Sequence, residues 1–328
     1  MKILILGGHG FIGSHTSSKL KALGHTIGVV DCYHQYYTFP DWEYNPVLAQ
    51  RIALADADQV FKGRIEDQLF INGVFNDFKP DVVIHVATYP NAKMVHRNPV
   101  DAANNMVSAT ANILLNCTQH HVKRLVFASS SMVYGEFKTA APDETADCDP
   151  LTLYGSYKLQ GERMVKIWAQ DHDLEYVIMR PSALYGTRDM VVRVISQMAA
   201  GSLRNGAITV QGPDNRLDFS FVEDVAGYFT EAALNPAAVN QIFNCTRGRG
   251  RTILEAAELV QQRLGGEIII KPHDAFYPNR DTLNSDKIKH MLDYTPVWDI
   301  EQGIPAYLDW LLAQDFIDQL RDTIPQTA

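Results

Sequence analysis

The feature that most constrains the fold is a glycine-rich turn that links a short apolar strand to a helix at the start of the chain. Residues 2–6 read KILIL, an almost wholly apolar run typical of a strand covered by helices on both faces. The run continues into GGHGFIG at residues 7–13, and residues 14–23 then carry a helical pattern. A second β-rich run, TIGVV at residues 26–30, ends in Asp31.

This spacing has a physical reason. The first glycines let the backbone turn tightly and approach a pyrophosphate, and the last one lets the helix pack close to the strand. The start of the helix offers free N–H groups and the positive end of its dipole to the phosphates. A carboxylate at Asp31 can accept from both adenosine ribose hydroxyls and repels a 2′-phosphate. The stretch therefore predicts a Rossmann dinucleotide site that prefers NAD to NADP.

Composition narrows the remaining classes. A net charge of −9 and the lack of a local basic run argue against a nucleic-acid surface. The four cysteines are widely scattered and include no C-x-x-C pair, which favours reduced thiols over disulfides or a zinc site, so no metal is expected. No apolar run approaches the roughly 20 residues that span a bilayer. We therefore expect a soluble, cytoplasmic protein without a membrane partner.

Strand and helix patterns alternate along the first half of the chain, which predicts a parallel sheet covered on both faces. The expected fold class is α/β, a Rossmann-type doubly wound parallel sheet with a smaller C-terminal substrate-binding lobe. The expected NAD-binding domain is 1–180, with 222–245 re-entering it, and 181–328 is mainly the substrate-binding lobe. Strands are expected at 81–86, 121–129, 174–179, 207–211, 241–245 and 268–271, a strand and turn at 61–67, and helices at 47–60, 68–78, 99–120, 151–171, 190–200, 222–234, 252–264, 285–292 and 300–312.

Two further stretches carry groups suited to acid–base chemistry. SSSMVYG at 129–135 follows a predicted strand, and the carboxyl end of a strand is where ligands bind in open α/β sheets. Tyr154 and Lys158 are four residues apart on a predicted helix, so they lie on one face. A nearby ammonium and an oxidised nicotinamide both favour the phenolate form of a tyrosine whose ordinary pKa is ~10. A serine opposite can hold a substrate hydroxyl while its proton moves to Tyr154.

These motifs occur in order with RPSALYG at 180–186 and DFSFVED at 218–224. Over residues 1–315 the chain resembles the extended short-chain dehydrogenase/reductase family, in its NAD-dependent sugar-nucleotide epimerase/dehydratase branch. The resemblance implies that Tyr154 is the base, that Lys158 lowers its pKa and binds the ribose, and that Ser130 is the catalytic serine. The cofactor contacts that we assign are Gly7, Gly10, Phe11, Ile12, Gly13, Asp31, Ile65, Ala87 and Lys158.

Departures from the family pattern narrow the chemistry. Related 4,6-dehydratases carry Thr-Asp-Glu before Val-Tyr-Gly, whereas this chain has Ser130-Ser131-Met132, which favours an epimerase. The usual diphosphate-binding arginine is replaced by Leu217, and the asparagine of Arg-Pro-x-Asn by Ala183. Because a diphosphate still needs cationic donors, four arginines are candidates. They are Arg188, Arg193, Arg216 and Arg280.

Three further positions bear on the cofactor. Arg64 replaces an acidic residue that commonly contacts adenine, and Met106 stands where many relatives have a ribose-contacting asparagine, although Asn105 is adjacent. His85, after a buried strand, is interpreted as a packed histidine near the cofactor edge.

The sequence therefore predicts an NAD-dependent epimerase that transiently oxidises C4 of a nucleotide-linked sugar. The alternatives are a net dehydrogenase of a keto-sugar or other secondary alcohol, an atypical sugar-nucleotide dehydratase, and a non-catalytic dinucleotide sensor. The resemblance also implies a homodimer in which the helices near 99–120 and 151–171 of each subunit form a four-helix bundle.

Overall fold

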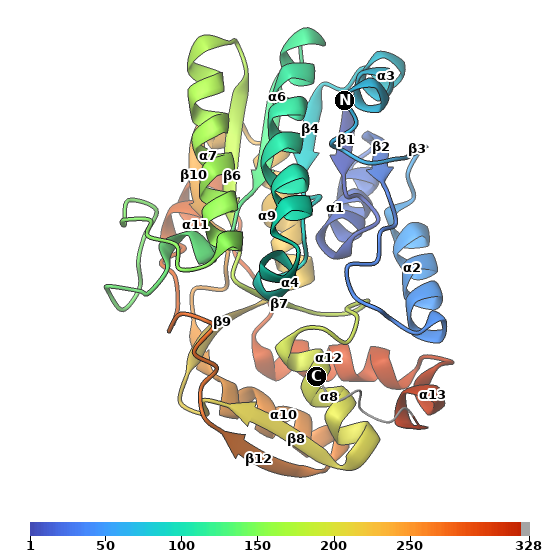
Figure 1. The fold of residues 1–328 in the computed structure, drawn as a ribbon, viewed down its shortest axis with the longest axis vertical. Coiled ribbons are helices and arrows are strands. Elements are labelled where there is room, and N and C mark those ends of the chain that lie inside the picture. Colours follow the sequence, from blue (N-terminus) through green and yellow to red (C-terminus); the bar gives the residue numbers. More distant parts are fainter. Residues whose placement is uncertain (323–328) are drawn as a thin grey trace.

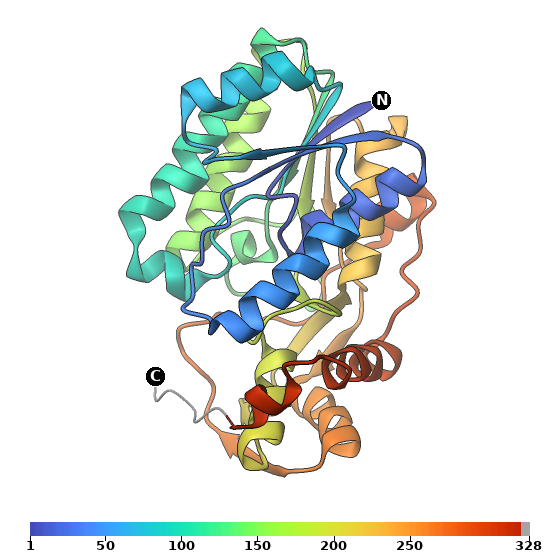
Figure 2. The same cartoon turned by 90° about the vertical axis from the view of Figure 1, so that its right-hand side faces the viewer.

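The larger part of the molecule is a seven-stranded parallel sheet, seen in the computed structural model, which describes residues 1–322 (Figures 1 and 2). The strand order is β10-β6-β5-β4-β1-β2-β3. The strands are β1 (Lys2–Leu6), β2 (Thr26–Asp31), β3 (Gln59–Lys62), β4 (Val82–His85), β5 (Arg124–Ala128), β6 (Glu175–Arg180) and β10 (Gln241–Asn244). Because β1 and β5 are buried along almost their whole length, their apolar runs are what such a sheet requires.

Helices cover both faces of this sheet, which confirms the predicted doubly wound α/β fold (Figure 2). One face carries α3 (Gln68–Phe78), α6 (Ala109–Gln119) and α7 (Leu153–Asp171). The other carries α1 (Phe11–Ala22), α9 (Val222–Leu234) and α11 (Asp286–Leu292), and α2 (Asp41–Ala55) packs against α1. Each face buries its own apolar cluster, so the sheet separates two hydrophobic cores.

The order of the strands places a ligand crevice beside β1. The chain passes from β1 through α1 to β2 on one side, whereas β4 pairs with the opposite edge of β1. Connections that leave neighbouring strands in opposite directions open a crevice at the carboxyl ends of those strands. The glycine turn that follows β1 opens into this crevice.

The smaller part of the molecule lies below the carboxyl ends of the large sheet (Figure 1). It contains a three-stranded and a two-stranded sheet with helices packed around a third apolar core. Its elements are β7 (Ala183–Tyr185), β9 (Arg216–Phe221) and β11 (Gly250–Thr252), β8 (Ala207–Gln211) and β12 (Glu267–Lys271), and the helices α8 (Val194–Asn205), α10 (Ile253–Leu264), α12 (Ile300–Leu312) and α13 (Ile317–Asp322).

Two predicted helices are displaced along the chain. The helix expected at 190–200 is α8, which covers Val194–Asn205. The sequence predicts a helix at 47–60, but α2 begins at Asp41 and ends at Ala55. It starts early because the aromatic residues before the predicted start pack against the core of the smaller part, and Asp56, with φ of 45°, ends it in a left-handed conformation. Residues 59–62 then form β3, whose side chains are mostly exposed, so its sequence carries no alternating apolar signal.

The predicted helix at 99–120 is interrupted. It begins with α5 (Pro99–Ala103), passes through a π-helical turn at Asn104–Ser108 and continues as α6, and a short helix α4 (Ala92–Arg97) precedes it. A π turn accommodates an extra residue and changes which side chains face inward. Two short 3₁₀ segments complete the helical elements of residues 1–322, Ser131–Tyr134 after β5 and Pro236–Ala238 after α9.

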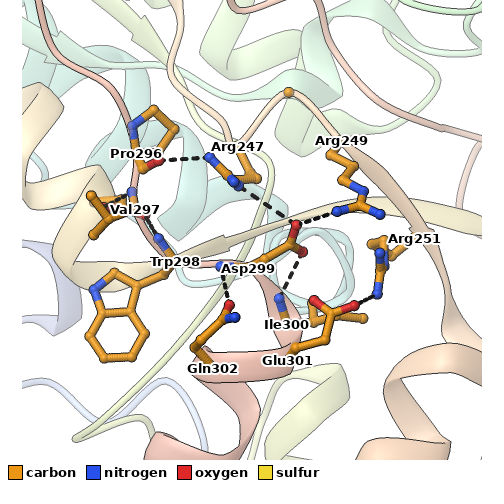
Figure 3. Close-up of polar contacts among 12 residues, drawn as sticks. Arg247, Arg249, Arg251, Pro296, Val297, Trp298, Asp299, Ile300, Glu301 and Gln302 are labelled. Atoms are coloured by element: carbon orange, nitrogen blue, oxygen red, sulfur yellow. Dashed lines mark hydrogen bonds and ion pairs between the residues drawn. The ribbon is translucent and has the colours of Figure 1, made fainter.

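Two of the segments that connect the larger and the smaller part of the molecule are bonded to each other (Figure 3). The Arg247 Nη1 atom, on the segment after β10, donates to the Pro296 carbonyl oxygen at 2.6 Å. Arg249 forms an ion pair at 2.9 Å with Asp299, whose carboxylate also accepts from the Ile300 N–H and so caps α12. Arg251 pairs with Glu301, two residues further along each segment. These contacts fix how the smaller part sits against the large sheet.

Candidate active site

A cavity of about 1070 Å³ lies between the carboxyl ends of the large sheet and the smaller part. Its walls bring together residues from the glycine turn, the ends of β2 and β5, the start of α7 and the segment before α11. All the predicted catalytic and cofactor-binding residues line it: Gly7, Gly10, Phe11, Ile12, Gly13, Asp31, Ile65, Ala87, Ser130, Tyr154 and Lys158.

The glycine turn fits a dinucleotide pyrophosphate because side chains have no room there. Gly7 has a φ of +82°, and a Cβ added to it comes within 2.8 Å of the Ala87 backbone. A Cβ on Gly13 comes within 2.3 Å of the Gly7 carbonyl oxygen, so this glycine allows α1 to approach the turn. Gly10 is the N-cap of α1, with no side chain to occupy the free N–H groups of the first helical turn.

Asp31 is held at the end of β2 by two backbone N–H groups. Its Oδ2 accepts from the His9 N–H at 3.1 Å, and its Oδ1 accepts from the Tyr33 N–H at 2.9 Å. A carboxylate has about four acceptor positions, so both oxygens can still accept from a ribose diol. The orientation of this carboxylate is therefore set by the glycine turn together with the segment that follows β2.

We expect Asp31→Ala to weaken NAD binding about ten-fold or more, since hydrogen bonds to a charged acceptor contribute about 1.5–3 kcal/mol. The preference for NAD over NADP should narrow, because the repulsion of the 2′-phosphate disappears with the carboxylate. Titration calorimetry with both dinucleotides measures the two effects, and Asp31→Asn separates lost charge from lost hydrogen bonding. Equal affinity of the wild-type protein for NAD and NADP would contradict this assignment.

Ser130 lies at the carboxyl end of β5 and is almost fully buried. Its Oγ accepts from the Met132 N–H at 3.2 Å and caps the 3₁₀ turn that follows. The Ser131 N–H donates to the Pro181 carbonyl oxygen at 2.8 Å, which ties the serine run to the end of β6. Ser130 therefore presents its hydroxyl from a backbone that is held on both sides.

The helix that carries Tyr154 and Lys158 packs closely against the serine run. The Thr152 side chain accepts from the Gly155 N–H and caps α7, and a Cβ on Gly155 comes within 2.5 Å of the Met132 carbonyl oxygen. The Lys158 Nζ donates to the Ala128 carbonyl oxygen at 2.7 Å and lies 5.9 Å from the centroid of the Tyr154 ring. The predicted triad is therefore assembled by two consecutive segments of the fold, β5 and α7.

Burial acts on both titratable members of the triad. Burial raises the pKa of Tyr154 to about 12, while a hydrogen bond from Ser130 and the charges of Arg193 and Arg280 act in the opposite direction. Burial lowers the pKa of Lys158 to about 7, and the negative charge of Glu162 opposes this. Ser130 and the two arginines are thus the protein groups that favour the Tyr154 phenolate, whereas the effect of Lys158 on Tyr154 stays a prediction from the sequence.

The structure separates the four candidate arginines. Arg280 donates from Nη1 to the Ser131 Oγ at 3.1 Å, and its Nε is buried without a partner among the described residues. Arg193 lies over the Phe11 ring, 4.8 Å from the centroid, and forms an ion pair with Asp189. Both line the cavity.

The other two candidates are less well placed. Arg216 lines the cavity, but its side chain pairs with Asp281 at 3.1 Å and with the Gly250 carbonyl oxygen. Arg188 is not among the lining residues, and its guanidinium bonds to the neighbouring Thr187 hydroxyl at 3.2 Å. The geometry therefore argues against Arg188 as a ligand, because its guanidinium is engaged outside the cavity.

The π-helical turn contains both Asn105 and Met106, and of these two only Asn105 lines the cavity. Met106 packs in an apolar cluster with Tyr89, Val95 and Ala102. Asn105 Oδ1 is buried and has no partner among the described residues. A helix of ordinary period drawn through the sequence does not reveal this arrangement.

His85, the last residue of β4, is buried beside the site. Burial lowers the pKa of His85 to about 3, and its ring packs edge-on against Phe127 at 5.6 Å, as expected for a packed neutral histidine. Four arginine or lysine residues of the cavity wall were not predicted from the sequence. They are Arg51, Lys93, Arg97 and Arg204. Lone arginines on helices give no sequence signal, because only the fold aims them at a common space.

Two findings concern other kinds of site. Among residues 1–322, no three histidine, cysteine, aspartate or glutamate side chains converge in a way that could hold a metal ion. No helix in the same range combines the length and the apolar character needed to cross a membrane.

The sequence and the fold that carry this site are similar to those of known proteins. The model of the NAD-dependent epimerase/dehydratase family matches residues 3–246. A putative UDP-glucose 4-epimerase of Methanocaldococcus jannaschii is 32% identical, over 94% of this chain and 98% of its own length. The structure of a UDP-glucose 4-epimerase from Thermotoga maritima with UDP-glucose has a TM-score of 0.84 at 25% identity, over 94% of this chain and 98% of its own.

A second solved structure is similar to the same extent. It is the UDP-glucose 4-epimerase of Thermus thermophilus in complex with NAD, with a TM-score of 0.83 at 25% identity, over 95% of this chain and 99% of its own. The family model and the relatives cover the glycine turn, the serine run and the Tyr154–Lys158 pair together. The chain belongs to the NAD-dependent epimerase/dehydratase family, and NAD is its cofactor.

Proposed function

We propose that the protein is a 4-epimerase of a nucleotide-linked sugar, with a UDP-sugar as the substrate class. The observation that carries this proposal is the meeting of Tyr154, Ser130 and Arg280 in one cavity with the glycine turn. The positions where related dehydratases carry an Asp-Glu pair hold Ser131 and Met132, and both line the cavity. The cavity therefore offers a base for oxidation at C4 but lacks that acid–base pair for eliminating water.

In this proposal the side chains move one proton and hold the sugar. The Tyr154 phenolate accepts the proton of the C4 hydroxyl, while the Ser130 hydroxyl holds the same oxygen. Bound NAD supplies the hydride acceptor and donor at this position. The 4-keto sugar turns within the cavity, so that the hydride would return to the opposite face of C4 while Tyr154 gives its proton back to the C4 oxygen. Lys158 binds the nicotinamide ribose and adds positive charge beside the phenolate.

We assign the diphosphate to Arg280 and Arg193. Arg280 reaches the serine run from the segment before α11, and Arg193 reaches the start of α1 from the N-cap of α8. Arginine is suited to this because its planar fork donates two parallel hydrogen bonds to phosphate oxygens.

We expect Arg280→Gln to raise the KM for the nucleotide sugar about ten-fold or more, since it removes a charge-assisted donor from the cavity. Arg188→Gln is the matched control, because it removes the same charge from a side chain that does not line the cavity. Steady-state kinetics on both variants makes the comparison. A KM that rises equally in the two variants would contradict the assignment.

The main alternative is a net dehydrogenase of the same fold. It is separated by denaturing the purified protein, identifying the dinucleotide that it releases, and then incubating native protein with UDP-hexoses and UDP-hexuronic acids. An epimerase retains NAD through purification and converts one C4 epimer into the other without free NADH. Stoichiometric NADH supports the dehydrogenase, loss of water from the sugar supports an atypical dehydratase, and no conversion of any sugar supports a dinucleotide sensor.

We further propose the domain division predicted from the sequence, with 1–180 and 222–245 binding NAD and the rest of 181–328 mainly binding the sugar nucleotide. The contribution of β10 to the large sheet supports this division.

We also propose a homodimer through the helices of 99–120 and 151–171. Exposed apolar side chains on these helices support it, namely Val100, Leu115, Leu153 and Ile167. A cytoplasmic location remains a prediction.

A further inference from the structure

A buried ion pair lies directly behind the proposed catalytic residues. Glu162 is on α7, one turn after Lys158, and its side chain is fully buried. Arg180, at the end of β6, donates from Nε to one Glu162 carboxylate oxygen at 2.9 Å and from Nη2 to the other at 2.7 Å. Such a two-pronged pair fixes both orientation and distance.

The same carboxylate is bonded to the serine run. The Ser129 hydroxyl donates to Glu162, and the next residue is Ser130, the proposed catalytic serine. One turn earlier on α7, the Lys158 Nζ donates to the Ala128 carbonyl oxygen. The helix therefore holds the end of β5 at two successive residues, from two side chains that share a face.

The network extends away from the cavity and is satisfied there. The Arg180 Nη1 donates to the Tyr134 hydroxyl at 2.8 Å, and that hydroxyl donates to Asn244 Oδ1 at 2.7 Å. The Asn244 Nδ2 in turn donates to two backbone carbonyl oxygens. A buried charge pair costs desolvation free energy, and it can be replaced by apolar residues in many proteins without loss of stability. The position of the Glu162–Arg180 pair behind the proposed catalytic residues therefore indicates a role in the site rather than in stability.

We infer that Glu162 is a positioning residue of the proposed reaction, which fixes the serine run against α7 through Ser129 and Arg180 and supplies the buried negative charge behind Lys158. This inference rests on the proposed function. Glu162 acts through Lys158 and Ser130 and touches neither substrate nor cofactor.

The groups around Lys158 show why this charge matters. His85 faces it from β4 and is neutral, Tyr154 and Glu162 lie on its own helix, and β5 contributes the Ala128 carbonyl and the Phe127 ring. Burial lowers the pKa of Lys158 to about 7, and Glu162 opposes that effect. Without Glu162 the lysine should therefore lose its proton at lower pH, and the remaining charge of Arg180 acts in the same direction.

The test is the pH dependence of Glu162→Gln. An opposite charge close to a titrating group shifts its pKa by about 1–3 units, so the alkaline fall of kcat/KM should move to lower pH by about one unit. The pH at which NAD affinity weakens should move in parallel, as measured by calorimetry without substrate. Asp171→Asn is the matched control, because it removes an exposed carboxylate from the same helix.

Two further variants keep the inference testable if Glu162→Gln alone fails to fold because Arg180 is left unpaired. The double variant Glu162→Gln, Arg180→Met removes both charges, and its kcat/KM should also fall at a lower pH than that of the wild type. Ser129→Ala keeps both charges and removes one hydrogen bond. Its kcat should therefore be lower, while the pH at which kcat/KM falls should be that of the wild type.

The outcomes separate this inference from the proposed function. If kcat/KM and NAD affinity fall at the wild-type pH in the variants that remove the Glu162 charge, the role of Glu162 is overturned. An equal shift of these pH values in Asp171→Asn would overturn it as well. If wild-type protein converts no nucleotide sugar, the proposed function fails, while the pH dependence of NAD affinity still tests the effect of Glu162 on Lys158.

Discussion

Tyr154→Phe is expected to lower kcat by about 10³-fold or more while NAD stays bound, because general-base catalysis contributes about 10²–10⁴-fold. The substitution removes only the ionisable oxygen and keeps the ring, which packs against the apolar cluster that contains Tyr89 and Met106. Tyr157→Phe is the matched control on the same helix. Its hydroxyl contacts the Pro99 carbonyl oxygen at 3.3 Å rather than Ser130.

The measurements are the turnover of a nucleotide sugar across pH and the NAD content of the purified variants. Wild-type turnover by Tyr154→Phe, or equal losses in the two variants, would show that another group takes the proton. Loss of NAD from Tyr154→Phe alone would show that the hydroxyl serves cofactor binding instead.

Lys158→Met is expected to reduce both catalysis and NAD affinity. Methionine fills a similar volume but removes the ammonium that donates to the Ala128 carbonyl oxygen beside Tyr154. We expect kcat to fall about 10²-fold or more, because the phenolate loses its nearby cation. NAD binding should weaken about ten-fold, in keeping with the loss of one charge-assisted donor to the ribose.

The pH profile makes this prediction specific. Burial places the pKa of Lys158 at about 7, so the wild-type rate should decline as the pH rises through that value and the ammonium is lost. Lys158→Met lacks this titration, and its alkaline limb should be absent. Lys166→Met, further along the same helix, should keep the wild-type profile. An unchanged alkaline limb in Lys158→Met would assign that limb to another group.

Much of the fold could be predicted from the sequence because its signals are local. The apolar run of β1, the glycine turn and the carboxylate at Asp31 lie within thirty-one residues, and each is required by the geometry around one phosphate-binding turn. The pair of Tyr154 and Lys158 is equally local, since four residues make one helical turn. These are the parts of the candidate site that the structure brings together as expected.

The remainder depends on contacts between distant segments. Arg280 reaches Ser131 across 149 residues, and no spacing rule distinguishes it from Arg188. Strand β3 begins two residues before the strand and turn predicted at 61–67, because its exposed side chains carry no apolar signal and its start follows from pairing with β2. Asn105 lines the cavity and Met106 packs in an apolar cluster within one π-helical turn, whose extra residue leaves no mark in the apolar pattern.

The buried pair of Glu162 and Arg180 was also outside the sequence prediction. Each residue belongs to a helix or strand that reads normally, and their relation appears only when α7 packs over the ends of β5 and β6. Charged residues on an amphipathic helix are expected to face solvent, so the sequence gives no reason to bury Glu162.

The central claim, transient oxidation at C4 without loss of the hydride, is tested most directly with a nucleotide sugar that carries deuterium at C4. Purified protein is incubated with this sugar and excess unlabelled NAD, and both sugar and dinucleotide are analysed by mass spectrometry. The account predicts a C4-inverted product that keeps its deuterium, with no lasting absorbance at 340 nm. Transfer of the deuterium to the free dinucleotide pool, with accumulation of NADH, would contradict it and identify a net dehydrogenase.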